Sequence, residues 1–438
     1  VMAQILSPVN LYWAVSAIYL TIISRIFYSS GPHYSGGISY IAFVLLGTAV
    51  LWWKNSKKPL MEFELHPAVF LFGLVVLLFG EPLFENDHYR YLWEGKVFLS
   101  GLNPYLNSPD SPLLGGLEFS MKSRIGFPQL SSIYPPLALS WFGLGGVLPF
   151  AIGLRLLMLL NGLLLFLFFR KIKSRVIPLH LHWLVPLFQK EFIQAVHIDL
   201  LAFSFFFYYL MNSGRKLASV GLVLLSIWTK FLGIAAIPFL FFTQEKKMIP
   251  LILAVPLSLL AAIYFGVENL ENLTGALAFG ADWVWNPGFY TLLTRAIGFD
   301  SGSARQITFS VYGLFLIILA LLILVRLKRH KFQLKPQELD LYFYLIFGGL
   351  MFFTPVYNGW YFIWFAVPAL LLRLKTGVLY GVFSVFCYLS YGAADSWLPL
   401  GEFLTHIWFL LSFSELISKK GYFVDEQDAP PKTQNLAQ

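Results

Sequence analysis

Acidic, basic and aromatic side chains are concentrated in one short stretch, 85–94, which holds the residues best suited to proton transfer. Asp87 follows Glu85 by two positions and precedes Arg90 and Glu94, in a chain that is 58% hydrophobic and only 12% charged. A positioned carboxylate can act as a general base that takes the proton from a hydroxyl group. Asp87 could instead be a solvated loop acid or a helix N-cap, but its polar neighbours favour catalysis.

The neighbours of Asp87 are candidates for substrate contact. Arg90 and Glu94 are four positions apart, so they can form a helical ion pair or bind a substrate. Tyr91 and Trp93 could anchor a helix at the membrane interface, or their rings could stack on a sugar. The candidate substrate-binding residues of this stretch are therefore Glu85, Arg90, Tyr91, Trp93 and Glu94.

A lysine far along the chain is suited to binding an anion near a membrane. Lys230 has apolar residues on both sides. Its ammonium group could simply reach the aqueous interface. A short hairpin that presents it in the outer leaflet would instead suit the phosphate of a lipid, with Lys190 or Arg295 as a companion. We favour phosphate contact.

Two further segments carry polar candidates. His197 and Asp199 suggest a metal site, but residues two apart on a helix point to different faces. Since no third ligand stands at a supporting spacing, we predict no metal site and favour contact with a donor sugar or phosphate. Asn286, followed by Pro287 and Gly288, is typical of a turn, and it could cover a groove for an acceptor.

These candidates must be positioned by membrane-spanning helices. The 438-residue chain is 18% aromatic, and apolar runs recur from Leu11 to Leu416. Such a composition predicts an all-α polytopic membrane helical bundle with about 12–14 transmembrane helices. The first run, 11–27, lacks the features of a signal peptide and is interpreted as a retained span. The single cysteine, Cys387, excludes disulfides and thiolate metal sites.

The net charge of +8 comes from lysines and arginines in short loops between apolar runs. This placement is typical of cytoplasmic loops, so we predict no nucleic-acid binding. Three spans up to residue 80 then place the loop 81–132 outside. Two apolar runs, 135–150 and 152–169, precede the basic cluster 170–175. Because the first run is short and rich in proline and glycine, we expect it to dip into the outer leaflet without crossing.

With this one assumption, every later basic cluster falls on the cytoplasmic side. Spans near 178–190 and 195–212 place Lys190, His197 and Asp199 at their outer end. The stretch 217–242 is expected to be a hairpin with Lys230 at its outer tip. The predicted organisation is a single membrane domain, 1–420, with a first outer loop 81–150 that contains the dipping helix, a second outer loop 267–305, and a disordered cytoplasmic tail 421–438.

Several motifs resemble those of the GT-C glycosyltransferases, and in particular the polyprenyl-phosphate-mannose-dependent mannosyltransferases. The first outer loop carries the more specific similarity, and weaker markers follow up to Tyr361. The matching segments are Glu85-Asn86-Asp87, Gly101-Leu102-Asn103-Pro104-Tyr105, Ile133-Tyr134-Pro135-Pro136-Leu137, Lys190-Glu191, His197-Ile198-Asp199, Lys230, Asn286-Pro287, Pro355 and Trp360-Tyr361.

The resemblance implies an inverting transferase that moves one sugar from a polyprenyl-phosphate donor to a hydroxyl of a lipid or glycan acceptor. Mannose is the sugar that the resemblance implies. The resemblance also implies that Asp87 is the base, that Lys230 holds the donor phosphate, and that Trp360 contacts substrate. No cofactor is expected, and a divalent metal is possible but not required. The expected location is a bacterial inner membrane, with the site facing the periplasm. Membrane lipids are the expected surroundings.

The chain departs from the family pattern at two places. Many relatives carry Asp-x-Asp where this chain has Glu85-Asn86-Asp87, and some have His-Pro where Asn358 and Gly359 precede Trp360. Three alternatives stay open: the same fold acting on arabinose or glucose, a transporter or flippase for lipid-linked sugars, and a non-catalytic membrane scaffold. A transporter would place ionisable residues near the middle of its spans and show pseudo-symmetric halves. Here the charged groups gather at the outer ends.

Overall fold

The computed structural model describes residues 7–28, 34–57, 65–173, 180–211, 216–243, 249–254, 257, 283–329, 334–391 and 397–419. Within these ranges the chain is helical, and the β-structure is a single isolated bridge between Trp285 and Val356. The predicted all-α class is therefore confirmed. The tail 421–438 and the part 267–282 of the second outer loop lie outside the described residues.

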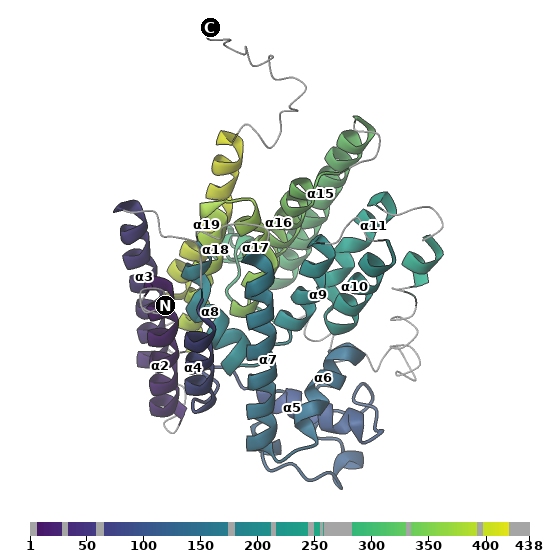
Figure 1. Cartoon of the computed structure of the whole chain (residues 1–438). Helices are drawn as coiled ribbons and strands as arrows, with labels where there is room; N and C mark the ends of the chain where they lie inside the picture. Colours follow the sequence, from purple (N-terminus) through teal and green to yellow (C-terminus); the bar gives the residue numbers. More distant parts are fainter. Residues whose placement is uncertain are drawn as a thin grey trace.

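Figure 1 shows the arrangement of the described helices. The α-helices are α2 (Pro8–Tyr28), α3 (Tyr34–Lys57), α4 (Pro67–Leu78), α5 (Asp87–Leu99), α6 (Pro136–Gly146), α7 (Phe150–Lys173), α8 (Val185–Phe188), α9 (Asp199–Met211), α10 (Lys216–Thr229), α11 (Ile237–Thr243), α14 (Phe289–Thr291), α15 (Ser301–Arg329), α16 (Pro336–Phe353), α17 (Phe362–Leu371), α18 (Lys375–Phe383) and α19 (Leu398–Ser418). Short 3-10 or π-helical segments are η1 (Pro112–Leu114), η2 (Lys122–Arg124), η3 (Leu181–Leu184), η4 (Gln189–Gln194), η5 (Phe231–Ala236), η8 (Leu292–Ile297), η9 (Gly359–Tyr361) and η10 (Ser384–Tyr391).

The length and composition of the helices agree with a polytopic membrane protein. Five helices in the described ranges are long and apolar enough to cross a membrane, namely Pro8–Phe27, Gly36–Lys54, Phe150–Ile172, Ser301–Arg329 and Leu398–Ser418. A bent pair, Leu181–Gln194 with Asp199–Met211, adds a sixth if it is one span, and shorter apolar helices accompany them. The total of about 12–14 crossings stays a prediction.

The first outer loop contains α5 and α6, which lie at the end of the bundle opposite the C-terminal end of α19 (Figure 1). With 11 residues, α6 is about 17 Å long, too short for a hydrocarbon core of about 30 Å. Its length agrees with the predicted dipping helix. The two helices approach closely at glycines, since a Cβ on Gly95 would lie 2.4 Å from the backbone nitrogen of Gly143. The two helices of the loop are therefore packed backbone to backbone at these glycines.

Asp199 and Lys230 each lie at a point where the helical backbone is interrupted. The bent pair turns by 118° at residues 195–198, so Asp199 stands at the start of α9. Lys230 has an extended backbone between α10 and η5, and η5 packs back against α10. This arrangement is the predicted hairpin with Lys230 at its tip. The start of the first outer loop is fixed by Glu81, whose carboxylate pairs with Arg155 at 2.6 Å.

Candidate active site

A cavity of about 1280 Å³ lies between the first outer loop and the following helices. One end is polar and is lined by residues of the first loop together with Asp199 and Lys230. The other end is apolar and runs between η5, α11, α15 and α16. The apolar lining consists of Phe231, Leu232, Ile234, Ala235, Pro238, Phe239, Tyr312, Leu316, Leu319, Ala320, Ile323, Ile346, Phe347, Leu350 and Met351.

Asp87 lines the polar end as the first residue of α5. The N-cap position of this helix is Asn86, whose side chain makes no capping hydrogen bond, so Asp87 is not the N-cap residue considered from the sequence. Within the described residues, the Asp87 carboxylate makes no hydrogen bond or ion pair. Burial, followed by the nearby charge of Glu85, raises the pKa of Asp87 to about 6, although Arg90 and two lysines oppose the rise. The carboxyl group is therefore free and poised to exchange a proton near neutral pH.

Lys230 lines the cavity and directly precedes Phe231, the first residue of the apolar lining. Its ammonium group donates to Asp199 at 2.6 Å and stands 4.4 Å from the centre of the Tyr361 ring. The indole of Trp364 donates to the other oxygen of Asp199 at 2.8 Å. Asp199 is buried, whereas the Lys230 side chain keeps 19% of its surface exposed. These contacts hold a cation in a fixed position at the cavity wall.

Arg90 connects α5 to a later part of the first loop through hydrogen bonds. Its guanidinium donates to Glu94 at 2.8 Å and to the carbonyl oxygens of Gly126, Phe127 and Leu130. Glu94 is buried and also accepts from Ser132 at 2.5 Å. The helical ion pair considered for Arg90 and Glu94 is therefore present. Arg90 still lines the cavity, and Glu94 does not.

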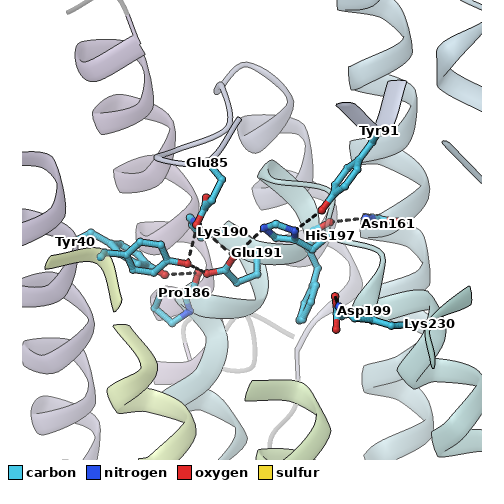
Figure 2. A network of polar contacts seen from close by, with 12 residues as sticks. Tyr40, Glu85, Tyr91, Asn161, Pro186, Lys190, Glu191, His197, Asp199 and Lys230 are labelled. Carbon is cyan, nitrogen blue, oxygen red and sulfur yellow. Dashed lines mark hydrogen bonds and ion pairs between the residues drawn. The ribbon is translucent and has the colours of Figure 1, made fainter. Parts of the chain in front are cut away.

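Two carboxylates, Glu85 and Glu191, lie on either side of the Lys190 ammonium group (Figure 2). Lys190 is fully buried in the π-helix η4. Its ammonium group donates to both oxygens of Glu85, one of them at 2.5 Å, and to Glu191 at 3.2 Å. The hydroxyl of Tyr388 accepts from Lys190 at 2.8 Å and donates to Glu191. Lys190 itself does not line the cavity.

His197 joins this buried group to the cavity wall. Its Nε2 lies 3.5 Å from Glu191, and its Nδ1 is hydrogen-bonded to the Tyr91 hydroxyl at 2.8 Å. The imidazole stacks on Trp360 with ring centres 3.8 Å apart. Tyr91 and Trp360 line the cavity, while His197 stands behind them.

The fold assembles a group of possible metal ligands that the sequence analysis did not find. Ligand atoms of Glu85, Glu191 and His197 lie within 4.8 Å of one another, and all three residues are buried. Two carboxylates and an imidazole could hold a divalent ion. The ammonium group of Lys190 already contacts both carboxylates, so a cation is present in this group.

The remaining predicted residues lie apart from the cavity. Trp93 is buried in a small cluster on the far side of α5. Asn286 is buried with a positive φ of 46°, and its carbonyl accepts from His406 at 2.9 Å. Arg295 pairs with Glu402 at 3.1 Å. The cavity lining therefore includes Glu85, Asp87, Arg90, Tyr91, Asp199, Lys230 and Trp360, but not Trp93, Glu94, Lys190, His197, Asn286 or Arg295.

The second outer loop contributes aromatic residues that the sequence analysis did not single out. Trp283 and Trp285 line the cavity, and Trp285 is pinned to the segment before η9 by backbone hydrogen bonds to Pro355 and Tyr357. Trp285 contacts Tyr391, and Trp283 contacts Phe127 of the first loop at 4.9 Å between ring centres. Their only signal in the sequence was the pair of tryptophans before a turn.

The chain matches one known family. Residues 12–244, more than half of the chain, match the model of the alpha-(1->6)-mannopyranosyltransferase N-terminal domain, the MptA_B family. No curated protein and no solved structure matches the chain. The match covers α5, α6, Asp87, Lys190, Asp199 and Lys230. It confirms the resemblance on which the expected activity rested. The chain belongs to this alpha-(1->6)-mannopyranosyltransferase family, and it is a glycosyltransferase of the membrane that acts on a sugar donor and an acceptor.

Proposed function

We propose that this mannosyltransferase takes mannose from a polyprenyl-phosphate donor and transfers it, with inversion, to a hydroxyl group of a glycan or lipid acceptor. The observation that carries the proposal is the two-part cavity, in which an unpaired carboxylate and a fixed cation open directly onto an apolar groove. The reacting groups and a hydrocarbon chain can therefore be held by one continuous site.

The apolar groove supports a lipid-linked donor. Its wall follows α15 from Tyr312 to Ile323, a distance of about 17 Å at the rise of an α-helix. Aliphatic and aromatic side chains line this part of the cavity, which suits a prenyl chain and offers few partners for a nucleotide. The groove extends toward the end of α15 that carries Arg326, Lys328 and Arg329.

Lys230 is proposed to bind the donor phosphate. It directly precedes the apolar lining residues Phe231 and Leu232, so the phosphate of a lipid held in the groove would lie within its reach. Its pairing with Asp199 fixes the ammonium group in advance. A preorganised cation stabilises the charge that develops on a leaving phosphate, and such stabilisation is commonly a large part of catalysis.

In the proposed step, Asp87 accepts the proton of the acceptor hydroxyl. The oxygen of that hydroxyl forms a bond to the anomeric carbon of mannose, and the bond from this carbon to the phosphate oxygen breaks. The electron pair leaves with the polyprenyl phosphate, whose charge faces Lys230. The raised pKa of Asp87, about 6, makes it a stronger base than an ordinary aspartate while it remains mostly ionised at neutral pH.

The aromatic wall supports an acceptor that presents a sugar ring. Phe127, Trp283, Trp285 and Tyr391 line the cavity on the side of the two outer loops. These side chains offer flat faces to the C–H groups of a pyranose. The apolar groove, in contrast, is lined by residues that suit a hydrocarbon chain. We assign this groove to the prenyl chain of the donor, and the aromatic wall to the acceptor.

We place the site at the outer face of the membrane, and we propose the periplasmic face of a bacterial inner membrane. The support is that α5 and α6 lie at one end of the bundle, whereas the last turn of α15 carries three basic residues at the other. Basic residues at helix ends are typical of the cytoplasmic side.

The test is transfer from radiolabelled polyprenyl-phosphate mannose by the purified protein in lipid nanodiscs. Asp87→Asn is expected to lower the transfer rate by about 100-fold or more, the usual contribution of a general base. Asp110→Asn is the matched control, because Asp110 is exposed on the same loop and does not line the cavity. Transfer by Asp87→Asn at the rate of the control would refute the proposed base.

A further inference from the structure

The buried ion group behind Asp87 contains more charge than an ordinary structural pair. Glu85 and Glu191 share one ammonium group, that of Lys190, and all three side chains are buried. Tyr388 bridges Lys190 and Glu191 from η10, almost 200 positions along the chain. Figure 2 shows Glu85 of the first loop pointing toward Lys190, Glu191 and His197, which lie on the segment 190–197.

We propose that Lys190 is a positioning residue whose ammonium group takes the place of a divalent metal ion among Glu85, Glu191 and His197. By holding Glu85 in this group, Lys190 leaves Asp87 as the carboxylate of the first loop that can act on the acceptor. The inference rests on the proposed role of Asp87 as the base, and it assigns to Lys190 a function in the reaction without contact to substrate.

The geometry supports a cation site that the chain fills itself. The ligand atoms of the two glutamates and the histidine lie within 4.8 Å of one another, close enough to surround one ion. The donor types, carboxylate oxygen and imidazole nitrogen, are those that bind divalent metals. Lys190 contacts two of the three and is fully buried, so an ion could enter the group only if this side chain were shortened.

The position of the group explains how it acts on Asp87. Glu85 precedes Asp87 by two residues at the start of the first outer loop. Both oxygens of Glu85 accept from the ammonium group of Lys190, so this contact holds the segment from which the Asp87 side chain reaches the cavity. Loss of Lys190 should therefore displace the base and slow the transfer step.

The first experiment compares kcat and KM for transfer in the parent and in Lys190→Met. We expect kcat to fall about tenfold or more, because a misplaced catalytic group is costly, while KM for the donor stays unchanged because Lys190 does not line the cavity. Glu85→Gln combined with Lys190→Met removes both charges and should recover part of kcat. Lys328→Met, an exposed lysine at the far end of α15, is the control that should change neither constant.

The folding of the variants also bears on the proposal. A buried carboxylate pair without its cation is strongly destabilising, so Lys190→Met alone could fail to fold. In that case the double variant with Glu85→Gln should fold and transfer. A double variant as damaged as Lys190→Met, or a folded Lys190→Met with the kcat of the parent, would overturn the proposal.

The second experiment tests the cation site without any need for transfer. Lys190→Ala opens space among the three ligands, and we expect this variant to bind Mn²⁺ with one more site than the parent, as read by electron paramagnetic resonance. Adding Glu191→Gln should remove that site. Binding of Mn²⁺ to the parent and to Lys190→Ala with equal stoichiometry would contradict the assignment. Since this readout does not depend on Asp87, it distinguishes a failure of the cation site from a failure of the proposed base.

Discussion

The acidity of Asp87 gives a quantitative prediction for the parent protein. Burial and the charge of Glu85 raise its pKa from 3.8 to about 6. A general base acts in its ionised form, so transfer should fall as the pH drops through the pKa of the base. The perturbation to apply is therefore pH itself, between about 5 and 8, with the donor and acceptor below saturation.

The size of the effect follows from the ionised fraction of Asp87. With a pKa of about 6, about 90% of the carboxylate is ionised at pH 7 and about 10% at pH 5. Transfer should therefore fall about tenfold between these values. An aspartate with the ordinary pKa of 3.8 would still be about 95% ionised at pH 5, so the two cases are well separated.

The assay is kcat/KM for transfer by purified protein in nanodiscs, measured over this pH range with a thermal-unfolding control at each pH. Glu85→Gln should move the acidic limb to lower pH, because it removes the neighbouring charge that raises the pKa of Asp87. A rate that stays constant down to pH 5 in a folded protein would refute the reasoning.

Further predictions concern the two parts of the cavity and the packing of the first loop. Lys230→Met should raise KM for the donor at least about tenfold, whereas Lys230→Arg should retain part of the binding because the charge remains. Ala320→Trp would fill the groove, so it should weaken transfer from a long-chain donor while sparing a short-chain analogue; equal losses would argue against a prenyl groove. Trp285→Ala should raise KM for the acceptor and leave KM for the donor unchanged, and the reverse pattern would remove the acceptor assignment. Gly95→Ala should lower stability by about 1–3 kcal/mol in thermal or denaturant unfolding, because its Cβ would meet the backbone of α6 at 2.4 Å, while Gly116→Ala, which has open space around it, should have no such effect.

The sequence was informative where loop charges or helix-breaking residues decide the local structure. Asp87 and Lys230 were predicted to lie on the same side of the membrane from charge placement, and the fold brings both to one cavity. The dipping helix was predicted from a short run that opens with two prolines and carries three glycines, and α6 is the short helix found there. In these cases the deciding features, loop charge and helix breakers, lie close together in the chain.

The sequence was less informative where the partner of a residue comes from a distant element. Lys190 was expected near the donor phosphate, but Tyr388 and Glu85 hold it behind the cavity. His197 lacked a third ligand in the sequence because Glu85 lies on another segment. The groove along α15 was also unpredictable, since an apolar side chain looks the same whether it faces lipid, another helix or a bound prenyl chain.

The most direct test of the central claim is to find where the donor binds. A polyprenyl-phosphate mannose with a photoreactive group in its prenyl chain should label peptides from 231–239, 312–323 and 346–351, and non-reactive donor should compete with it. Transfer from the same donor should exceed transfer from a nucleoside-diphosphate mannose. Labelling confined to other helices, or transfer only from the nucleotide sugar, would contradict the account.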